Sequence, residues 1–118
     1  MKVIVVGINP AKGSPKIKGA LSRLSTWMDE IGIKHWSFTN CIFSPGLYSY
    51  SEVDFEHLSK CVADYDKVIA LGGFPSRALT RIGVEHHVLP HPSGLNRNLN
   101  DREYEKAQVN MCKEYIYG

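Results

Sequence analysis

The distribution of apolar residues constrains the fold most strongly, because short apolar runs alternate with segments of helical periodicity along the chain. The first run, Lys2–Val6, is rich in β-branched residues and stops at Gly7, which is typical of a strand buried on both faces. Further strands are expected at His35–Thr39, Lys67–Leu71 and Glu85–Leu89. Each of these four runs precedes a segment that favours a helix.

The first expected helix covers about Ile17–Ile31, where apolar side chains recur every three or four positions and Gly32 provides a stop. The second carries Phe55, Leu58 and Val62 on one face, and Ser51 and Asp54 precede it as capping residues. The last two are expected at Pro75–Ile82 and Asp101–Tyr117, with Asp101 as N-cap. The order βαβαβαβα predicts a three-layer α/β/α sandwich with a central four-stranded, mostly parallel sheet. Its 118 residues suffice for one core, so we expect a single domain over residues 1–118.

Composition is that of an ordinary globular protein, with 43% hydrophobic and 22% charged residues and a net charge of +2. No apolar segment is long enough to span a bilayer, and no signal-peptide pattern follows Lys2. The three cysteines, Cys41, Cys61 and Cys112, are scattered and form no CxxC pair, which favours a reducing, cytoplasmic setting. We expect their thiols to be buried. Adjacent His86 and His87 would point to opposite faces of a strand, so no metal site is expected.

Two polar loops stand out because each follows an expected strand. Gly7-Ile8-Asn9-Pro10 comes after the first strand, and the segment from His91 to Asn98 comes after the fourth. The second loop combines a histidine, a proline-restricted turn, a glycine, a lone leucine and an arginine, a mixture that core packing does not require. Open α/β sheets bind ligands at the carboxyl ends of their strands, which makes these loops the candidate site.

The two loops carry a resemblance to the uracil-DNA glycosylase superfamily. Gly7-Ile8-Asn9-Pro10 resembles its first motif, in the form of the mismatch-specific uracil and thymine glycosylase branch. The segment His91–Arg97 resembles its second motif, with the His-Pro-Ser start of the classical enzymes and the Pro-Ser-Gly-Leu-x-Arg continuation of the mismatch branch. Thr39-Asn40 resembles a base-reading position, and Leu71-Gly72-Gly73 resembles the strand end before a helix. The motifs occur in the expected order from end to end, and they imply a compact glycosylase-like fold.

The resemblance implies a monofunctional DNA glycosylase that hydrolyses the N-glycosidic bond of uracil, or of a related modified pyrimidine, flipped out of DNA. His91 would act as a neutral donor that stabilises the departing base anion, and Asn9 would orient the attacking water. No lysine matches a Schiff-base position, and no cofactor is implied. The plainer interpretations are that His91 caps a backbone carbonyl and that Asn9 caps the turn before Pro10.

Recognition of the flipped base would involve Asn40, Ile8 and an aromatic ring. The Asn40 amide both donates and accepts, which suits the Watson–Crick edge of a pyrimidine, although an asparagine at a strand end is also an ordinary turn residue. Phe43 is the preferred stacking ring. Tyr48 and Trp36 are the other candidates, but Trp36 is expected to pack in the hydrophobic core instead.

Contacts to DNA, the expected partner of a monomeric protein, would come from both loops. Leu95 would fill the gap left by the flipped base, although it could equally pack on the last helix. Asn96 and Arg97 would contact phosphate or the unpaired base opposite. Backbone contacts are expected from small or basic residues, each of which could also be plain surface: Lys12, Ser14, Ser93 and Gly94.

Departures from the family pattern keep other functions open. The chain is short, Asn9 stands where many members carry aspartate, and Ala11 follows Pro10 where members usually have Gly or Tyr. The cysteine cluster of the iron–sulfur members is also absent from the sequence. One alternative is a nucleic-acid-binding module that has lost catalysis. Another is an N-glycosidic enzyme that acts on free or hypermodified nucleosides or nucleotides.

Overall fold

The computed structural model of the protein describes residues 1–8, 15–43, 49–92 and 97–118, except for the side chains of residues 15–19 and 97. Four strands lie in this part of the chain: β1 (Val3–Gly7), β2 (Ser37–Asn40), β3 (Lys67–Leu71) and β4 (His87–Leu89). The α-helices described are α1 (Pro15–Ile31), α2 (Phe55–Val62), α3 (Gly73–Arg81) and α4 (Arg102–Tyr117). Two short 3₁₀ turns, η1 (Tyr50–Glu52) and η2 (Arg97–Asn100), precede α2 and α4.

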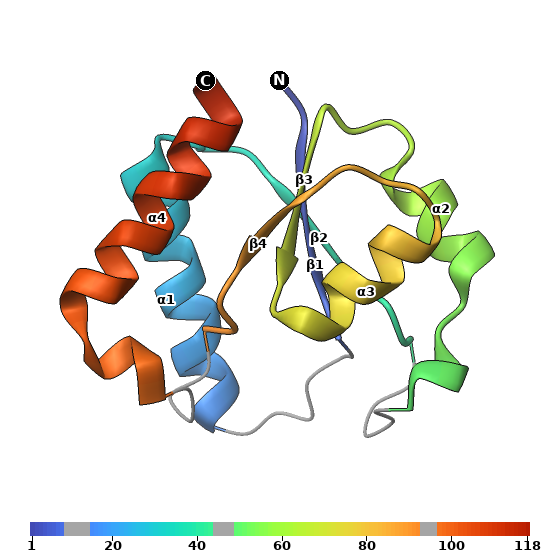
Figure 1. Ribbon diagram of the computed structural model, residues 1–118, viewed down its shortest axis with the longest axis horizontal. Helices are drawn as coiled ribbons and strands as arrows, with labels where there is room; N and C mark the ends of the chain where they lie inside the picture. Colours follow the sequence, from blue (N-terminus) through green and yellow to red (C-terminus); the bar gives the residue numbers. More distant parts are fainter. Residues whose placement is uncertain (9–14, 44–48, 93–96) are drawn as a thin grey trace.

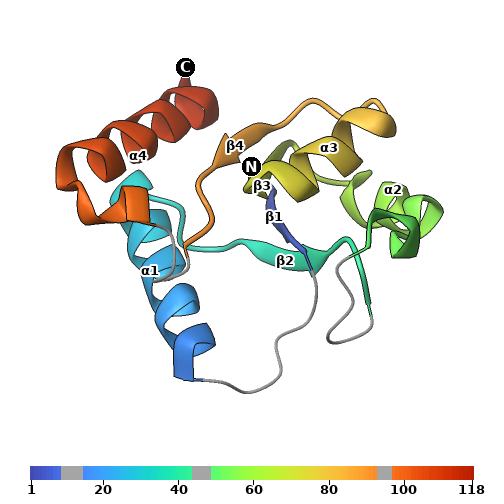
Figure 2. The same cartoon turned by 60° about the horizontal axis from the view of Figure 1, so that its bottom comes forward.

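The strands form one parallel sheet in the order β2-β1-β3-β4, between two layers of helices. α1 and α4 lie against one face and α2 and α3 against the other, as Figures 1 and 2 show. The predicted three-layer α/β/α architecture is therefore confirmed. Strands β1 and β3 occupy the centre, so the loops that follow them leave from the middle of the sheet.

Alternation along the central strand β1 explains how one short run supports both layers. Val3 and Val5 belong to the core beneath α1 and α4, whereas Ile4 and Val6 belong to the core beneath α2 and α3. All five residues of the strand are buried. Burial of each such side chain stabilises the fold by about 1.5–3 kcal/mol, which is why the continuous apolar run predicted a strand covered on both faces.

Several element boundaries differ by one or two residues from those expected, and two of the differences have a clear local reason. α3 begins at Gly73 rather than at Pro75, because a proline is tolerated within the first helical turn, where its missing N–H is not needed. β4 begins at His87 rather than at Glu85. The His86 ring is bonded instead to the Val84 carbonyl oxygen at 2.8 Å and to the Ser76 hydroxyl at 2.7 Å.

The caps of α2 and α4 use aspartate side chains. Asp101 accepts hydrogen bonds from the backbone N–H groups of Glu103 and Tyr104, which confirms the N-cap expected there. Asp54 accepts from the N–H of His57 and begins α2, whereas Ser51 belongs to the separate turn η1. In the described part of the chain, no helix has the length and apolar character needed to cross a bilayer.

Candidate functional site

The carboxyl ends of β1 and β2 are joined beyond the last residues of the strands themselves. Gly7 pairs with Asn40, and the ladder continues as the N–H of Cys41 donates to the Gly7 oxygen at 3.0 Å. The N–H of Ile42 then donates to the Ile8 oxygen at 2.8 Å. The backbone of Ile8, an expected base-contacting residue, is thereby fixed at the carboxyl edge of the sheet.

The Asn40 side chain leans over the end of the neighbouring strand β1. A Cβ atom placed on Gly7 would lie 2.8 Å from Asn40 Oδ1 and 2.8 Å from the Phe38 ring. Such a separation is shorter than van der Waals contact, so the absence of a side chain at Gly7 is what allows this amide to approach β1. The half-buried Asn40 thus directs its polar group toward the centre of the sheet.

His91 lies at the same carboxyl edge, beside the residue that follows β3. It follows β4 by two residues and lies against Gly72, where a Cβ atom would be 3.7 Å from His91 Cβ. Gly72 adopts a φ of +93°, a conformation that glycine accommodates without strain, and its N–H donates to the Leu89 oxygen at 2.8 Å. Strand β3 and the residues after β4 are therefore connected at the carboxyl edge.

Strand order determines the distance between the strand ends that carry Asn40 and precede His91. β2 and β4 are the two outer strands, so their ends are separated by three strand spacings, or about 14 Å. Asn40 leans over β1 and His91 lies beside β3, and these two strands are adjacent. The two side chains therefore lie beside neighbouring central strands at the carboxyl edge of the sheet.

Partial burial lowers the pKa of His91, although its side chain keeps an exposed surface. A histidine with a lowered pKa is uncharged at neutral pH and can donate one N–H without carrying a full charge. That protonation state is the one expected of a donor to an anion that forms only during a reaction.

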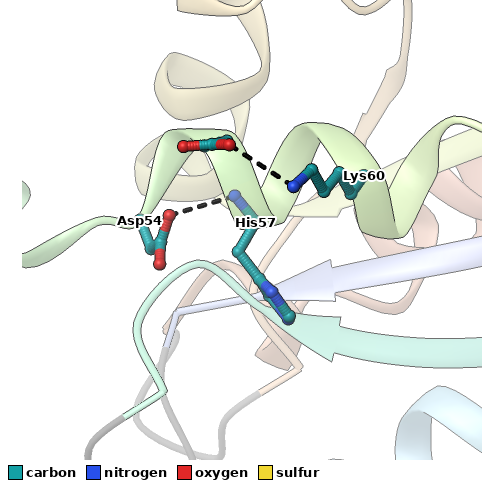
Figure 3. A network of polar contacts seen from close by, with 4 residues as sticks. Asp54, His57 and Lys60 are labelled. Carbon is teal, nitrogen blue, oxygen red and sulfur yellow. Dashed lines mark hydrogen bonds and ion pairs between the residues drawn. The ribbon is translucent and has the colours of Figure 1, made fainter.

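Phe43 lies close to the same edge, three residues beyond Asn40, and keeps 43% of its surface exposed. Its ring meets the His57 ring edge to face, with centroids 4.5 Å apart and an interplanar angle of 87°. His57 projects from the first turn of α2, where Asp54 caps its N–H at 3.0 Å (Figure 3). Sequence reasoning missed His57, since no spacing or motif brings it near Phe43 and only the folded chain does.

The turn η2, which precedes α4, is anchored to the core by a leucine. Leu99 of η2 is 5% exposed and packs into the core between the sheet and the pair α1 and α4. Leu95 lies outside the described residues, so both roles suggested for it stay predictions. Arg97 begins η2, and only its backbone is described.

Several predicted site residues lie outside the described residues, namely Asn9, Lys12, Ser14, Tyr48, Ser93, Gly94, Leu95 and Asn96. Their roles remain predictions from the sequence. Those that are described, Ile8, Asn40, Phe43 and His91, all belong to segments at the carboxyl edge of the sheet. Trp36 is half-buried against the core beneath α1 and α4.

Residues that could bind a metal ion do not gather in the described part of the chain, where no group of three His, Cys, Asp or Glu side chains converges. His86 bonds to Ser76 of α3, and His87 stacks on Tyr115 of α4 with ring centroids 5.4 Å apart. The two histidines therefore lie on opposite faces of the sheet. All three cysteines are free, and burial raises the pKa of Cys41 and of Cys112 to about 12, so neither thiol is poised as a nucleophile.

Comparison with known proteins adds no relative from which a function could be transferred. No protein-family model matches the chain, and no curated protein matches it. The resemblance to the uracil-DNA glycosylases consequently rests on the motifs of this sequence and on the chemistry that its side chains could perform.

Proposed function

We propose that the protein is a monofunctional DNA glycosylase that hydrolyses the N-glycosidic bond of uracil, or of a related modified pyrimidine, flipped out of DNA. The observation that carries the proposal is that His91, which lies beside Gly72, and Asn40, which leans over Gly7, are both at the carboxyl edge of one parallel sheet. Ligands of open parallel sheets bind at this edge, and both side chains follow motifs that resemble those of the glycosylases.

In this reaction the bond between the sugar C1′ and the base nitrogen breaks, and its electron pair leaves with the base. A water oxygen bonds to C1′ and loses a proton, and the base anion takes up a proton after departure. His91 donates a hydrogen bond to the carbonyl oxygen on which the negative charge accumulates. A donor of this kind in a site that excludes water contributes about 2.7–4 kcal/mol to transition-state stabilisation.

Recognition of the base falls to Asn40, whose amide donates to one polar atom of the pyrimidine edge and accepts from another. Phe43 supplies the stacking ring, and its exposed surface together with the edge-to-face contact from His57 supports that role. Asn9 orients the water, and Leu95 occupies the space of the flipped base, as the resemblance implies. The product would be an abasic site for base-excision repair in the cytoplasm, a location that free cysteines suit.

The proposal is tested by incubating purified protein with labelled oligonucleotides that carry one deoxyuridine opposite guanine, opposite adenine or in a single strand. Alkali then converts abasic sites into strand breaks. We expect breaks with the wild type and a loss of about 100-fold or more for His91→Ala, the usual effect of removing one such donor. His35→Ala is the matched control, because His35 is an exposed histidine that precedes β2 at the amino end of the sheet.

The outcome separates the glycosylase from its alternatives. If the wild type releases no base from any uracil, mismatch or modified-pyrimidine oligonucleotide, the glycosylase proposal is wrong. Binding without release that also survives His91→Ala would favour a nucleic-acid-binding module. Release of base from free nucleosides alone would identify the nucleoside enzyme.

A further inference from the structure

A second feature of the surface lies on the layer formed by α2 and α3 and consists of two arginines stacked on aromatic rings. Arg77 of α3 lies over the Tyr50 ring, with 4.5 Å between its guanidinium carbon and the ring centroid. Arg81, one turn further along α3, lies over the Phe55 ring at 4.6 Å. Together with Phe74, these residues are called here the arginine–aromatic face.

The rings beneath the arginines support one another. Tyr50 meets Phe55 at 5.4 Å and Phe74 at 5.8 Å between centroids, with interplanar angles of 67° and 72°. The Tyr50 hydroxyl also donates to the carbonyl oxygen of Arg77 at 3.3 Å, which ties η1 to α3. Edge-to-face pairs of this kind are favourable beyond the burial of their area, so the rings under the guanidinium groups support one another.

Stacking leaves the hydrogen-bonding capacity of the arginines available. A guanidinium group carries five N–H donors, and a cation–π contact with a ring does not satisfy them by conventional hydrogen bonds. Both arginines are exposed, and in the described part of the chain neither forms an ion pair with a carboxylate, whereas Lys60 pairs with Glu56 at 3.3 Å. Two fixed positive groups therefore face outward without a partner among the described residues.

We propose that the arginine–aromatic face binds the phosphodiester backbone of a single-stranded nucleic-acid segment. Arg77 and Arg81 are four positions apart on one helix, or about 6 Å along its axis, which is close to the separation of neighbouring phosphates on one strand. Planar guanidinium groups match phosphate oxygens with paired N–H donors, and the rings beneath them hold that geometry.

The position of this face relates it to the candidate site. α3 begins at Gly73, directly after the Gly72 that contacts His91, and runs from there toward α2 (Figure 1). A strand whose base occupies the carboxyl edge can therefore continue along α3. This inference rests on the proposed function for the identity of its ligand, and it adds a phosphate-binding surface that neither polar loop contains.

The test measures binding of a fluorescein-labelled oligothymidylate, which contains no uracil, by fluorescence anisotropy over a series of salt concentrations. Each phosphate contact to a single strand contributes about 0.7 to the slope of log K against log salt. We expect Arg77→Gln with Arg81→Gln to reduce that slope by about 1.4, and the two matching lysine substitutions to retain it. Lys113→Gln is the control, because it removes one exposed charge from α4 in the opposite layer and should leave binding through this face unchanged.

The results distinguish this surface from the proposed reaction. An unchanged slope in the double glutamine variant, in a protein that still releases uracil, overturns the phosphate-binding surface and leaves the glycosylase intact. A reduced slope in a protein that releases no base supports the surface and removes the reaction. If polyglutamate displaces the oligonucleotide from the wild type and binds more tightly than the oligonucleotide, the face prefers an acidic peptide and the inference is wrong.

Discussion

Single atoms decide the chemistry available at the carboxyl edge of this sheet. The hydrogen at Gly7, in place of a methyl group, lets the Asn40 amide approach β1, and the positive φ of Gly72 lets the chain turn beside His91. A side chain at Gly7 would displace the Asn40 amide, whereas at Gly72 it is the positive φ, and not contact with His91, that favours glycine. The glycines therefore determine the shape of the candidate site, while Asn40 and His91 supply its polar groups.

Gly7→Ala should impair base recognition far more than it impairs stability. The added Cβ would lie 2.8 Å from the ends of two side chains, Asn40 and Phe38, which can move aside at a cost we expect to be below about 1 kcal/mol. Displacement of Asn40 should reduce uracil release about tenfold or more at an almost unchanged Tm. Gly73→Ala is the control, since nothing lies within 4 Å of a Cβ there. Equal activity of the two variants would contradict the role given to Asn40.

His87 provides a prediction on stability and pH. Its Nε2 is buried with no hydrogen-bond partner in the described part of the chain, and burial lowers the pKa of His87, with a further decrease from nearby His86. As pH falls below about 6.5, the unfolded chain binds a proton that the folded protein resists, so stability declines with acidification. The pKa of His91 is also lowered, and His91 contributes in the same direction.

His87→Phe should stabilise the protein by about 1 kcal/mol, because the stacking on Tyr115 persists and the unsatisfied nitrogen is removed. The gain should increase between pH 7 and pH 5, where the wild-type histidine becomes progressively more costly. Urea denaturation at several pH values measures both effects. If the variant is less stable than the wild type at pH 5, the His87 imidazole has a hydrogen-bond partner and the prediction is wrong.

At the scale of elements, sequence patterns predicted the helices and strands well and their ends less well. The third strand was expected at Lys67–Leu71, where β3 lies, and the N-cap at Asp101 is confirmed. The start of α3 was misplaced because proline is allowed in a first turn, and η1 and η2 were not expected. Short 3₁₀ turns have no periodicity long enough to appear in a sequence.

Asp101→Ala should destabilise the protein by about 1 kcal/mol, since two backbone N–H groups at the start of α4 lose their acceptor. The effect should extend to η2, whose last residue immediately precedes this cap. Hydrogen exchange of the first-turn amides of α4, together with urea denaturation, would detect it. Asp64→Ala, at an exposed aspartate that caps no described helix, should lie within about 0.5 kcal/mol of the wild type.

At the scale of the whole molecule, strand order determines which segments meet. In the order β2-β1-β3-β4, the two central strands are neighbours. Asn40 is the last residue of the outer strand β2, and His91 follows the outer strand β4. On one face, α1 and α4 come from opposite ends of the chain and are joined by a hydrogen bond from Trp27 Nε1 to Glu105 Oε1 at 2.9 Å. This hydrogen bond links the first and last described helices within one layer.

Glu105→Ala should lower the free energy of unfolding by about 1–2 kcal/mol, because the buried indole N–H of Trp27 loses a charged acceptor. Glu105→Gln, which retains an acceptor oxygen, should lose less than half of that amount. Glu114→Ala, an exposed change on the same helix, is the control. Urea unfolding followed by Trp fluorescence measures all three, and equal losses for Glu105→Ala and Glu114→Ala would exclude a stabilising bond between the helices.

The sequence by itself determined the class of fold, most of the elements and the two loops that carry the candidate chemistry. It could do so because strand and helix periodicities are local, and because polar residues at strand ends can be recognised without knowing the neighbours of a strand. Only the tertiary structure decided that His91 lies against Gly72, that Phe43 meets His57 and that Arg77 stacks on Tyr50. These contacts join residues from different elements, and they depend on strand order and close packing, which no local pattern of the chain contains.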